Sequence, residues 1–271
     1  MKKFKGIRLE VEEGSFGSHW DARYMHWEVM TEEDSYEIVL SDMTLAFFED
    51  LGFYEVNYYT GGLFRFGKNQ GCAIFEKKCI YNEGTLFPNE FCLESTEHIC
   101  SSFHISKGIC HIVNYKDNIP EKYRYFSNPK IGGKILTDYC PISFYDKPDP
   151  YTIYKMNCRF GDPEYEDETL GTYAGCFESS LNSETILSKC YLLEWDKENR
   201  QIKVQIKEKT IICNGTKNIM IDPEGFKGNL TCPDYNMVCT SETWCNNFFE
   251  WCEWGSLLII PLMIIFLIKR N

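Results

Sequence analysis

Histidine is the residue type in this 271-residue chain that most readily binds a metal or transfers a proton, and five histidines are present. They are His19, His26, His98, His104 and His111. No two of them form H-E-x-x-H, the spacing by which one helix presents two imidazoles to a zinc ion. The last three lie six and seven residues apart. Because that spacing does not bring ligands onto one helical turn, we expect surface or hydrogen-bonded side chains there.

Two other common catalytic patterns are missing from the sequence. There is no G-x-S-x-G, the turn that exposes a nucleophilic serine, and no G-x-G-x-x-G, the loop that accepts a dinucleotide. Acidic residues cluster at Glu49-Asp50 and within Asp162–Glu168, where they could suggest acid–base catalysis or a calcium loop. The first pair ends an expected helix and the second cluster lacks calcium-loop spacing, so we predict that both are solvated surfaces.

Fourteen cysteines dominate the composition, and their even number predicts up to seven disulfides. The sequence contains no C-x-x-C, so zinc ribbons and thiol–disulfide oxidoreductase motifs are excluded. A reducing cytosol gives little reason to keep so many thiols, and we therefore predict a secreted or cell-surface protein. The residues expected to form disulfides are Cys72, Cys79, Cys92, Cys100, Cys110, Cys140, Cys158, Cys176, Cys190, Cys213, Cys232, Cys239, Cys245 and Cys252.

The charge balance argues against one class of partner. The chain has 28 Lys and Arg against 40 Asp and Glu, a formal net charge of −12. A surface of that sign repels phosphates, so we exclude nucleic acid as a partner. Hydrophobic residues make up 44% of the chain and charged residues 25%, which is ordinary for a folded protein. The length allows one large domain or two smaller ones.

The first 66 residues contain no cysteine, and the change in composition after them marks the predicted domain boundary. We predict a short helix within Ala22–Met30 and a stronger one that begins at Ser41 or Asp42, whose side chains can accept first-turn N–H groups. The stronger helix carries apolar residues at a helical spacing and ends at Gly52. A strand over Phe53–Tyr58 is expected to follow.

Residues 67–253 form the expected cysteine-rich domain, which we predict to be mainly β. Ile202, Val204 and Ile206 alternate with polar residues, the period of a half-buried strand. Turn residues are frequent throughout this part. Disulfides stabilise such loop-rich folds by roughly 2–4 kcal/mol each, chiefly by restricting the unfolded chain. The order of the cysteines does not determine how they pair.

Residues 254–271 are predicted to form a short transmembrane anchor with a basic tail. Leu257–Ile268 is an uncharged apolar run that Trp254 precedes and that Lys269 and Arg270 follow. Its twelve residues rise about 18 Å as a helix, against a hydrocarbon thickness of ~30 Å, so the span would be short. Two alternatives stay open, namely a signal for a glycolipid anchor and a buried terminal helix or strand.

Two further features concern export. Asn214 and Asn229 each begin an N-x-[ST] triplet and are the expected glycosylation sites. The segment Met1–Glu10 has a basic start but lacks the apolar run of a signal peptide. Because a disulfide-rich protein must be exported, we expect the natural N-terminus to lie upstream, with another export route as the alternative.

Several short motifs occur in one order along residues 14–250. Gly17-Ser18-His19-Trp20 precedes Glu28-Val29-Met30-Thr31, and the capped helix follows. Further on come Asn69-Gln70-Gly71-Cys72 and the segment Cys232–Cys239. This ordered series resembles the leishmanolysin family of surface zinc endopeptidases, in which a long insertion separates the H-E-x-x-H helix from the third zinc histidine.

The resemblance implies an α+β fold. It comprises the end of a metzincin-type catalytic domain over residues 1–66, a disulfide-rich, mainly β domain over 67–253, and the C-terminal membrane anchor. It also implies that His19 is the third imidazole ligand of zinc and that Met30 is the Met-turn residue, the apolar floor beneath the metal. The implied partners are peptide or protein substrates and, through the tail, a lipid bilayer. The implied location is the cell surface.

The sequence departs from the family where catalysis is concerned. It has no H-E-x-x-H, so two zinc ligands and the glutamate that activates water are missing, and we assign no catalytic residue. A catalytic zinc ion needs three protein ligands and a water. We therefore predict a C-terminal fragment of a zinc metalloendopeptidase that is inactive as this chain alone. The alternatives are a non-catalytic cysteine-rich adhesion or binding module, and a dead fragment that misfolds in the cytosol.

Overall fold

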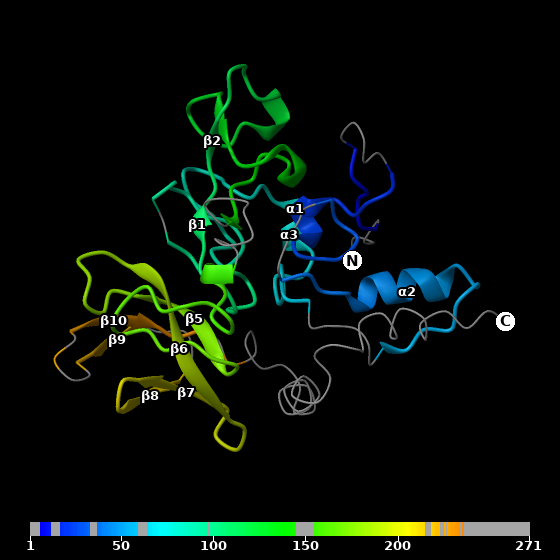
Figure 1. The fold of residues 1–271 in the computed structure, drawn as a ribbon. Helices are drawn as coiled ribbons and strands as arrows, with labels where there is room; N and C mark the ends of the chain where they lie inside the picture. Colours follow the sequence, from blue (N-terminus) through cyan, green and yellow to red (C-terminus); the bar gives the residue numbers. More distant parts are fainter. Residues whose placement is uncertain are drawn as a thin grey trace.

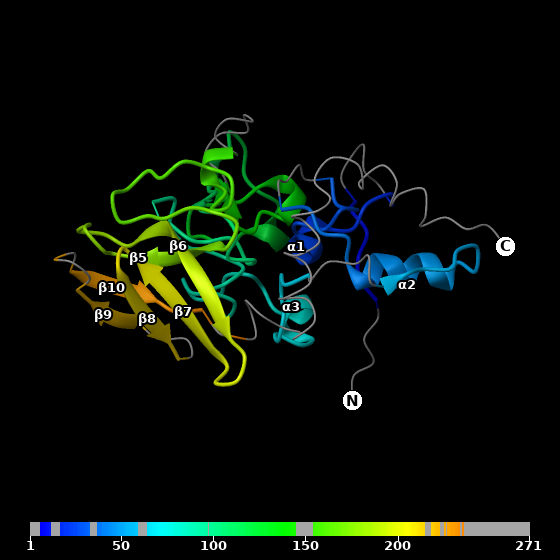
Figure 2. The same cartoon turned by 60° about the horizontal axis from the view of Figure 1, so that its bottom comes forward.

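A computed structural model shows how the chain is arranged (Figure 1). It describes residues 6–11, 17–32, 37–58, 64–96, 98–144, 154–214, 218–222, 225, 227–233 and 235. A strand-rich part lies on one side and the helices lie on the other, with a loop-rich lobe at the top of the view (Figures 1 and 2). Mixed helix and strand with several disulfides agrees with the predicted α+β class.

Both helices predicted near the N-terminus form, although the first is shorter than expected. Helix α1 covers Ala22–Met25 and is capped by Asp21, whose carboxylate accepts a hydrogen bond from a first-turn N–H. It ends because the backbone of His26 turns to a ψ of 136°. Helix α2 covers Asp42–Asp50 and begins, as predicted, at the side chain of Ser41.

The segment after α2 differs from the prediction. Gly52 has a φ of +70°, the left-handed conformation expected of a residue that stops a helix. The predicted strand over Phe53–Tyr58 is wrong, because these described residues pair with no other strand. Phe53 is 71% exposed, and α2 points away from the sheet in Figure 2. Strand-forming residues need a neighbouring strand that bonds their N–H and C=O groups, and none of the strands among the described residues pairs with this segment.

Arg23 fixes α1 to the cysteine-rich part of the chain. Its side chain is buried, and Nη2 donates a 2.7 Å hydrogen bond to the carbonyl oxygen of Lys77. Nη1 lies 2.8 Å from Cys140 Sγ. The guanidinium also stacks on the rings of Tyr24 and Phe91, contacts that strengthen as water is excluded. The N-terminal helix therefore packs as part of the same body.

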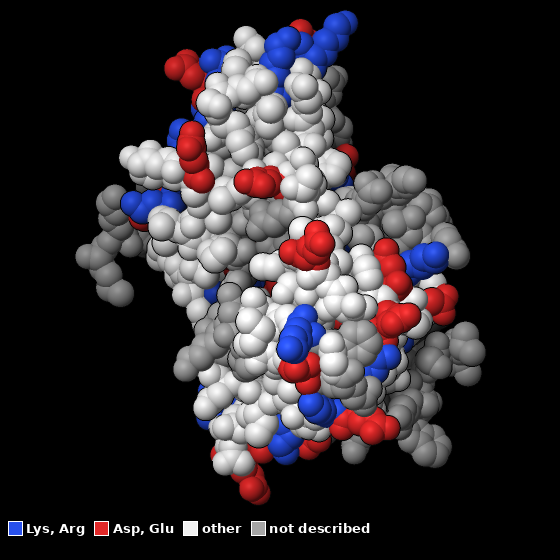
Figure 3. Space-filling model, turned by 90° about the vertical axis from the view of Figure 1, so that its left-hand side faces the viewer, with Lys and Arg blue, Asp and Glu red and all other residues white. Residues whose placement is uncertain are grey.

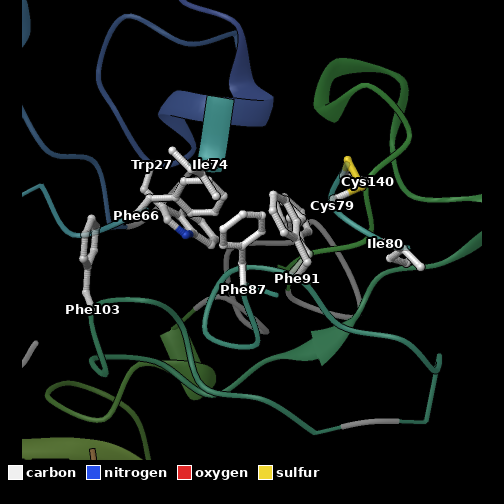
Figure 4. Close-up of a cluster of buried hydrophobic side chains, with 11 residues drawn as sticks. Trp27, Phe66, Ile74, Cys79, Ile80, Phe87, Phe91, Phe103 and Cys140 are labelled. Carbon is white, nitrogen blue, oxygen red and sulfur yellow. A yellow bond between two sulfur atoms is a disulfide. The ribbon is translucent and has the colours of Figure 1, made fainter. Parts of the chain in front are cut away.

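One aromatic core contains residues from both sides of the predicted boundary at 66/67 (Figure 4). Trp27 and Phe66 come from the first part, and helix α3, Ala73–Glu76, brings Ile74 from the second. The other buried members are Cys79, Ile80, Phe87, Phe91, Phe103, Cys140, Ile142 and Phe144. The rings of Phe66 and Phe91 meet edge to face at 5.8 Å, a favourable geometry. The domain boundary itself stays a prediction.

The loop-rich lobe contains very short strands. These are β1 (Ile109–Cys110), β2 (Val113–Asn114), β3 (Ile131–Gly132) and β4 (Ser143–Phe144). β1 pairs with β4 and β2 pairs with β3, both antiparallel. Two 3-10 helices, η2 (Glu121–Tyr123) and η3 (Ile135–Thr137), complete the lobe. Such short elements bury little apolar surface, so cross-links matter here.

The strand-rich part is one antiparallel sheet in the order β8-β7-β6-β5-β10-β9. Its strands are β5 (Ala174–Ser179), β6 (Leu187–Asp196), β7 (Gln201–Ile206), β8 (Lys209–Cys213), β9 (Asn218–Ile221) and β10 (Gly228–Thr231). The alternating run of Ile202, Val204 and Ile206 is β7, which confirms that prediction. All three side chains point into a second core with Phe177 and Tyr191.

The sheet curls so that its two edge strands approach each other. The Lys209 ammonium, at the start of β8, donates a 2.8 Å hydrogen bond to the Asp222 carbonyl just after β9. The Cys213–Cys232 disulfide joins the end of β8 to the residue after β10. A chain that connects β8 to β9 within a few residues requires this closeness, because an extended residue spans only about 3.5 Å.

Five disulfides link ten of the cysteines. They are Cys79–Cys140, Cys92–Cys110, Cys100–Cys176, Cys158–Cys190 and Cys213–Cys232. Cys72 is exposed and forms no disulfide with another described cysteine. Cys239, Cys245 and Cys252 lie outside the described residues, so a role for these four in disulfides stays a prediction.

The prediction that the acidic segment 162–168 is a solvated surface is wrong for its last two residues. Asp167 is fully buried and Glu168 nearly so. Lys189 Nζ lies 2.9 Å from Asp167, and Lys107 Nζ lies 3.2 Å from Glu168. Two lysines buried by the fold require counter-ions, and this segment supplies them. By contrast, Glu49 and Asp50 at the end of α2 are exposed, as predicted.

Acidic and basic side chains are interspersed on the face that Figure 3 shows, with several cations at the top of that view. Within the residues that the structure describes, no helix is long and apolar enough to cross a bilayer. The predicted anchor, residues 254–271, lies outside them and stays a prediction.

Candidate metal-binding region around His19

His19 follows a tight turn that only glycine makes easily. Gly17 has a φ of +73°, in the left-handed region, and its N–H donates to the Glu10 carbonyl. The Glu10 N–H in turn donates a 2.9 Å hydrogen bond to the His19 carbonyl. The imidazole is half-buried, with Nδ1 3.0 Å from Ser18 Oγ. The turn therefore fixes the backbone of His19 and leaves its ring within reach of a ligand.

The Trp20 and Met30 backbones meet directly. The Trp20 N–H donates a 2.9 Å hydrogen bond to the Met30 carbonyl, so the chain returns beside His19 after ten residues. Between them, α1 and the turn at His26–Met30 form the loop. Met30 is half-buried. The residue that follows His19 is therefore a backbone neighbour of Met30, and the predicted roles of His19 and Met30 at a metal stay predictions.

Glu28, a residue that sequence reasoning left without a role, connects this loop to α2. The residue is 2% exposed, and its carboxylate accepts hydrogen bonds from four donor groups. Oε2 accepts from the Met30 N–H at 2.6 Å. Oε1 accepts from the Ser41 N–H at 3.0 Å, the Ser41 hydroxyl at 2.8 Å and the Thr44 hydroxyl at 2.5 Å. In the sequence, the only sign that Glu28 has a role was its place as the glutamate of the E-x-M-T motif.

Trp20 makes two further contacts with α2. Its indole N–H donates a 2.8 Å hydrogen bond to Thr44 Oγ1. Its ring meets that of Phe47 edge to face at 5.6 Å, and Phe47 in turn contacts Phe48. Phe47 is 42% exposed although aromatic, so α2 presents an apolar ring to the surface next to Trp20.

The donor set around His19 fits zinc only in part. An imidazole is a common zinc ligand, and His19 presents one that is accessible. Among the described residues, however, no three His, Cys, Asp or Glu side chains converge in a way that could hold a metal ion. His19 can therefore be one ligand of a zinc site, and the described residues supply no complete set.

The other histidines have structural surroundings. His104 Nδ1 lies 2.8 Å from the Cys176 carbonyl, a hydrogen bond in line with the prediction for this group. His98 is partly buried, which lowers its pKa. His26 is fully buried, and neither ring nitrogen has a hydrogen-bond partner among the described residues. Burial, together with the nearby Lys134 ammonium, holds the pKa of His26 well below its usual range.

Three buried carboxyl groups near these elements escaped sequence reasoning. Burial raises the pKa of Asp21, Glu37 and Glu90 to about 7 in each case. Asp21 caps α1, and the negative charge of Asp138 raises its pKa further. Isolated acidic residues in a sequence with 40 of them carry no sign of burial, so only the fold identifies these groups.

The predicted glycosylation sites lie on the surface. Asn214 follows β8 and Asn229 lies within β10, and both are exposed. Exposure is what an attached glycan requires. Their use as glycosylation sites stays a prediction.

Comparison with known proteins gives a consistent result. The family model described as leishmanolysin matches residues 3–245. A leishmanolysin homolog of Crithidia fasciculata is 27% identical over 246 residues, covering 84% of this chain and 37% of that protein. Leishmanolysin of Leishmania major is 27% identical over 261 residues, covering 85% and 41%. A leishmanolysin-like peptidase of Caenorhabditis elegans is 29% identical over 208 residues, covering 65% and 31%. The chain thus spans less than half the length of these relatives.

Proposed function

The chain belongs to the leishmanolysin family of metallopeptidases, and on that basis we propose that it supplies the third zinc histidine and the Met-turn of a zinc endopeptidase. His19 would provide the imidazole ligand, and Met30 the apolar floor. The observation that carries this proposal is the 2.9 Å hydrogen bond from the Trp20 N–H to the Met30 carbonyl. It holds the residue after His19 beside Met30, as a ligand placed over a Met-turn requires.

Each residue of this region has a definite part in the proposed function. A zinc ion in such a site polarises a peptide carbonyl and lowers the pKa of a bound water. His19 would hold the metal through its half-buried imidazole, while the Gly17 turn fixes its backbone. Trp20 and α2 would exclude water from one side of the site, because the indole and the ring of Phe47 form an apolar surface there.

Catalysis would need groups that these 271 residues do not contain. One imidazole is a single ligand, whereas catalytic zinc is held by three protein ligands. The general base in H-E-x-x-H peptidases is the glutamate of that motif, which is missing from this sequence. We therefore expect proteolysis only when a segment with H-E-x-x-H completes the site, and no activity from these residues alone.

The proposed setting is the cell surface. Five disulfides and two exposed N-x-[ST] sites are typical of secreted proteins, since an oxidising compartment maintains such cross-links. The substrates would be peptides or proteins. The C-terminal run Leu257–Ile268 would tether the protein to a bilayer, as a membrane span or a glycolipid signal.

A chimera tests the proposed function directly. The part of Leishmania major leishmanolysin that precedes the matched region would be fused to this chain and the product assayed for zinc content and casein cleavage. We expect chelator-sensitive cleavage that His19→Ala abolishes, with His98→Ala as the control histidine. An active chimera that retains zinc and activity after His19→Ala would refute the role of His19.

A further inference from the structure

The Glu28 side chain is the acceptor in all four of its hydrogen bonds. The backbone N–H groups of Met30 and Ser41 can only donate, and they meet Oε2 and Oε1 respectively. Both oxygens of the Glu28 side chain therefore act as hydrogen-bond acceptors. None of the ion pairs among the described residues includes Glu28. The carboxylate is satisfied by hydrogen bonds from the loop and from the first turn of α2.

Two of these bonds belong to a closed ring of hydrogen bonds among Trp20, Thr44, Glu28 and Met30. The indole N–H of Trp20 donates to the Thr44 hydroxyl, and that hydroxyl donates to Glu28 Oε1. Glu28 Oε2 accepts from the Met30 N–H, and the Met30 carbonyl accepts from the Trp20 N–H. Each of the four residues is thus held by two others. A closed ring restricts the relative position of residues 20 and 30 more than any one of its bonds does.

We propose that Glu28 is a positioning residue, which through this ring holds the His19-Trp20 peptide over Met30 and so fixes the direction in which His19 meets the metal. The inference rests on the proposed function for the role of the metal. The ring itself rests only on the geometry above. Glu28 touches neither substrate nor metal in this account and acts through Met30 and Thr44.

The chemistry of the ring explains why these residue types are needed. Thr44 must both accept a hydrogen bond from the indole and donate one to the carboxylate, which a hydroxyl can do and a methyl group cannot. A glutamine at position 28 would turn an NH2 group toward at least one donor, so a buried bond would be lost. Serine at position 44 keeps the hydroxyl. These differences allow nearly isosteric variants to separate the ring from simple packing.

Amide hydrogen exchange on the disulfide-bonded 271-residue chain tests the ring. We expect Glu28→Gln and Thr44→Val to raise the exchange rates of the Trp20 and Met30 amides by about tenfold or more relative to the Cys176 amide, because local opening costs less. Thr44→Ser should restore the slow rates, and the exposed Glu32→Gln should leave them unchanged. Unchanged exchange in both Glu28→Gln and Thr44→Val would overturn the proposal.

A metal probe tests the direction of His19 without any catalysis. Ni²⁺ added to the chain binds accessible imidazoles and broadens the NMR signals of nearby protons. We expect broadening of the Met30 methyl signal that depends on His19, and its loss in Glu28→Gln and Thr44→Val but not in Thr44→Ser. Equal broadening in the parent and in Glu28→Gln would contradict the positioning role. Absence of broadening in the parent would instead refute the proposed zinc geometry, and amide exchange would still decide on the ring.

Discussion

Lys189 Nζ lies 2.9 Å from Asp167 Oδ1, and neither side chain is exposed to solvent. The Tyr191 hydroxyl donates a 2.6 Å hydrogen bond to the other carboxylate oxygen, and Lys189 also donates to the Leu181 carbonyl. The pair ties the irregular segment before β5 to strand β6. Its removal therefore tests how far this loop depends on buried charge.

We expect Lys189→Met to destabilise the chain by about 3–5 kcal/mol, because it leaves the Asp167 carboxylate buried without its cation. The double variant Lys189→Met with Asp167→Leu should recover much of that loss, since no charge is then left unpaired. Urea unfolding with the disulfides intact measures both. The control is Lys203→Met, which removes the partly exposed ion pairs with Glu194 and Asp196 and should cost much less, because water still reaches the charges. A single variant as stable as the double one would contradict the account.

The sequence predicted the elements that local residues determine. The helix at 42–50 carries its own cap in Ser41, and β7 carries its own alternation. The prediction of a strand over Phe53–Tyr58 was wrong, because a strand also needs a second strand to pair with, and the residues of the segment do not show whether one is present. The burial of the Asp167 carboxylate was missed for the same reason, since its partner Lys189 lies 22 residues away in the sequence.

The candidate site likewise has one part that could be predicted from the sequence and one part that only the fold reveals. The motif around His19 and Met30 was recognisable from the sequence, and the fold brings the two segments together. The ring that joins them was not recognisable, because three of the four donors to Glu28 come from Ser41 and Thr44, 13 and 16 residues further along at the start of α2. Hydrogen bonds across such distances follow from tertiary packing, and the residue types alone leave many other partners open.

Asp21 provides a test of pH dependence. Burial, and then the charge of Asp138, raise its pKa from 3.8 to about 7. The unfolded chain gives up this proton near pH 4 and the folded chain keeps it to about pH 7, so the stability that Asp21 contributes is present at low pH and lost across that range. Asp21→Asn keeps an N-cap and removes the titration.

We therefore expect Asp21→Asn to be more stable than the parent above pH 7, by an amount on the order of 2–4 kcal/mol, and to gain less at pH 4. Chemical unfolding at several pH values measures the difference. The exposed Asp117→Asn is the control and should give a nearly constant difference. If the gain from Asp21→Asn did not grow between pH 4 and 7, the raised pKa would be wrong.

His26 should make the stability depend on pH in the opposite direction from Asp21. Its pKa is lowered by burial and by Lys134, so the folded chain keeps the ring neutral where the unfolded chain protonates it. The stability that depends on neutral His26 is present above pH 6.5 and is lost as the pH falls below that value. The imidazole lies against the rings of Trp27 and Phe66, which provide no hydrogen-bond acceptor for a protonated imidazole.

We expect the parent to lose roughly 1–2 kcal/mol of unfolding free energy between pH 6.5 and pH 5 on account of His26. His26→Phe fits an aromatic surrounding and cannot be protonated, so its stability should fall less over the same range. The half-buried His19→Gln serves as the control and should follow the parent. Equal acid sensitivity of His26→Phe and the parent would show that other groups cause the loss.

Zinc content is the last test, and it separates a single ligand from a complete site. One imidazole binds zinc weakly, because tight binding needs three or four protein ligands that share the cost of removing the ion's water. We expect the 271-residue chain to retain less than one zinc per molecule after dialysis, and to cleave no casein. His19→Ala should change the melting temperature little, since the ring is half-buried and lies beside the hydroxyl of its neighbour Ser18. Metal analysis, calorimetry and a casein assay measure the three quantities. A stoichiometric zinc, removed by a chelator with a drop in melting temperature that His19→Ala reproduces, would mean that these residues assemble a complete site after all.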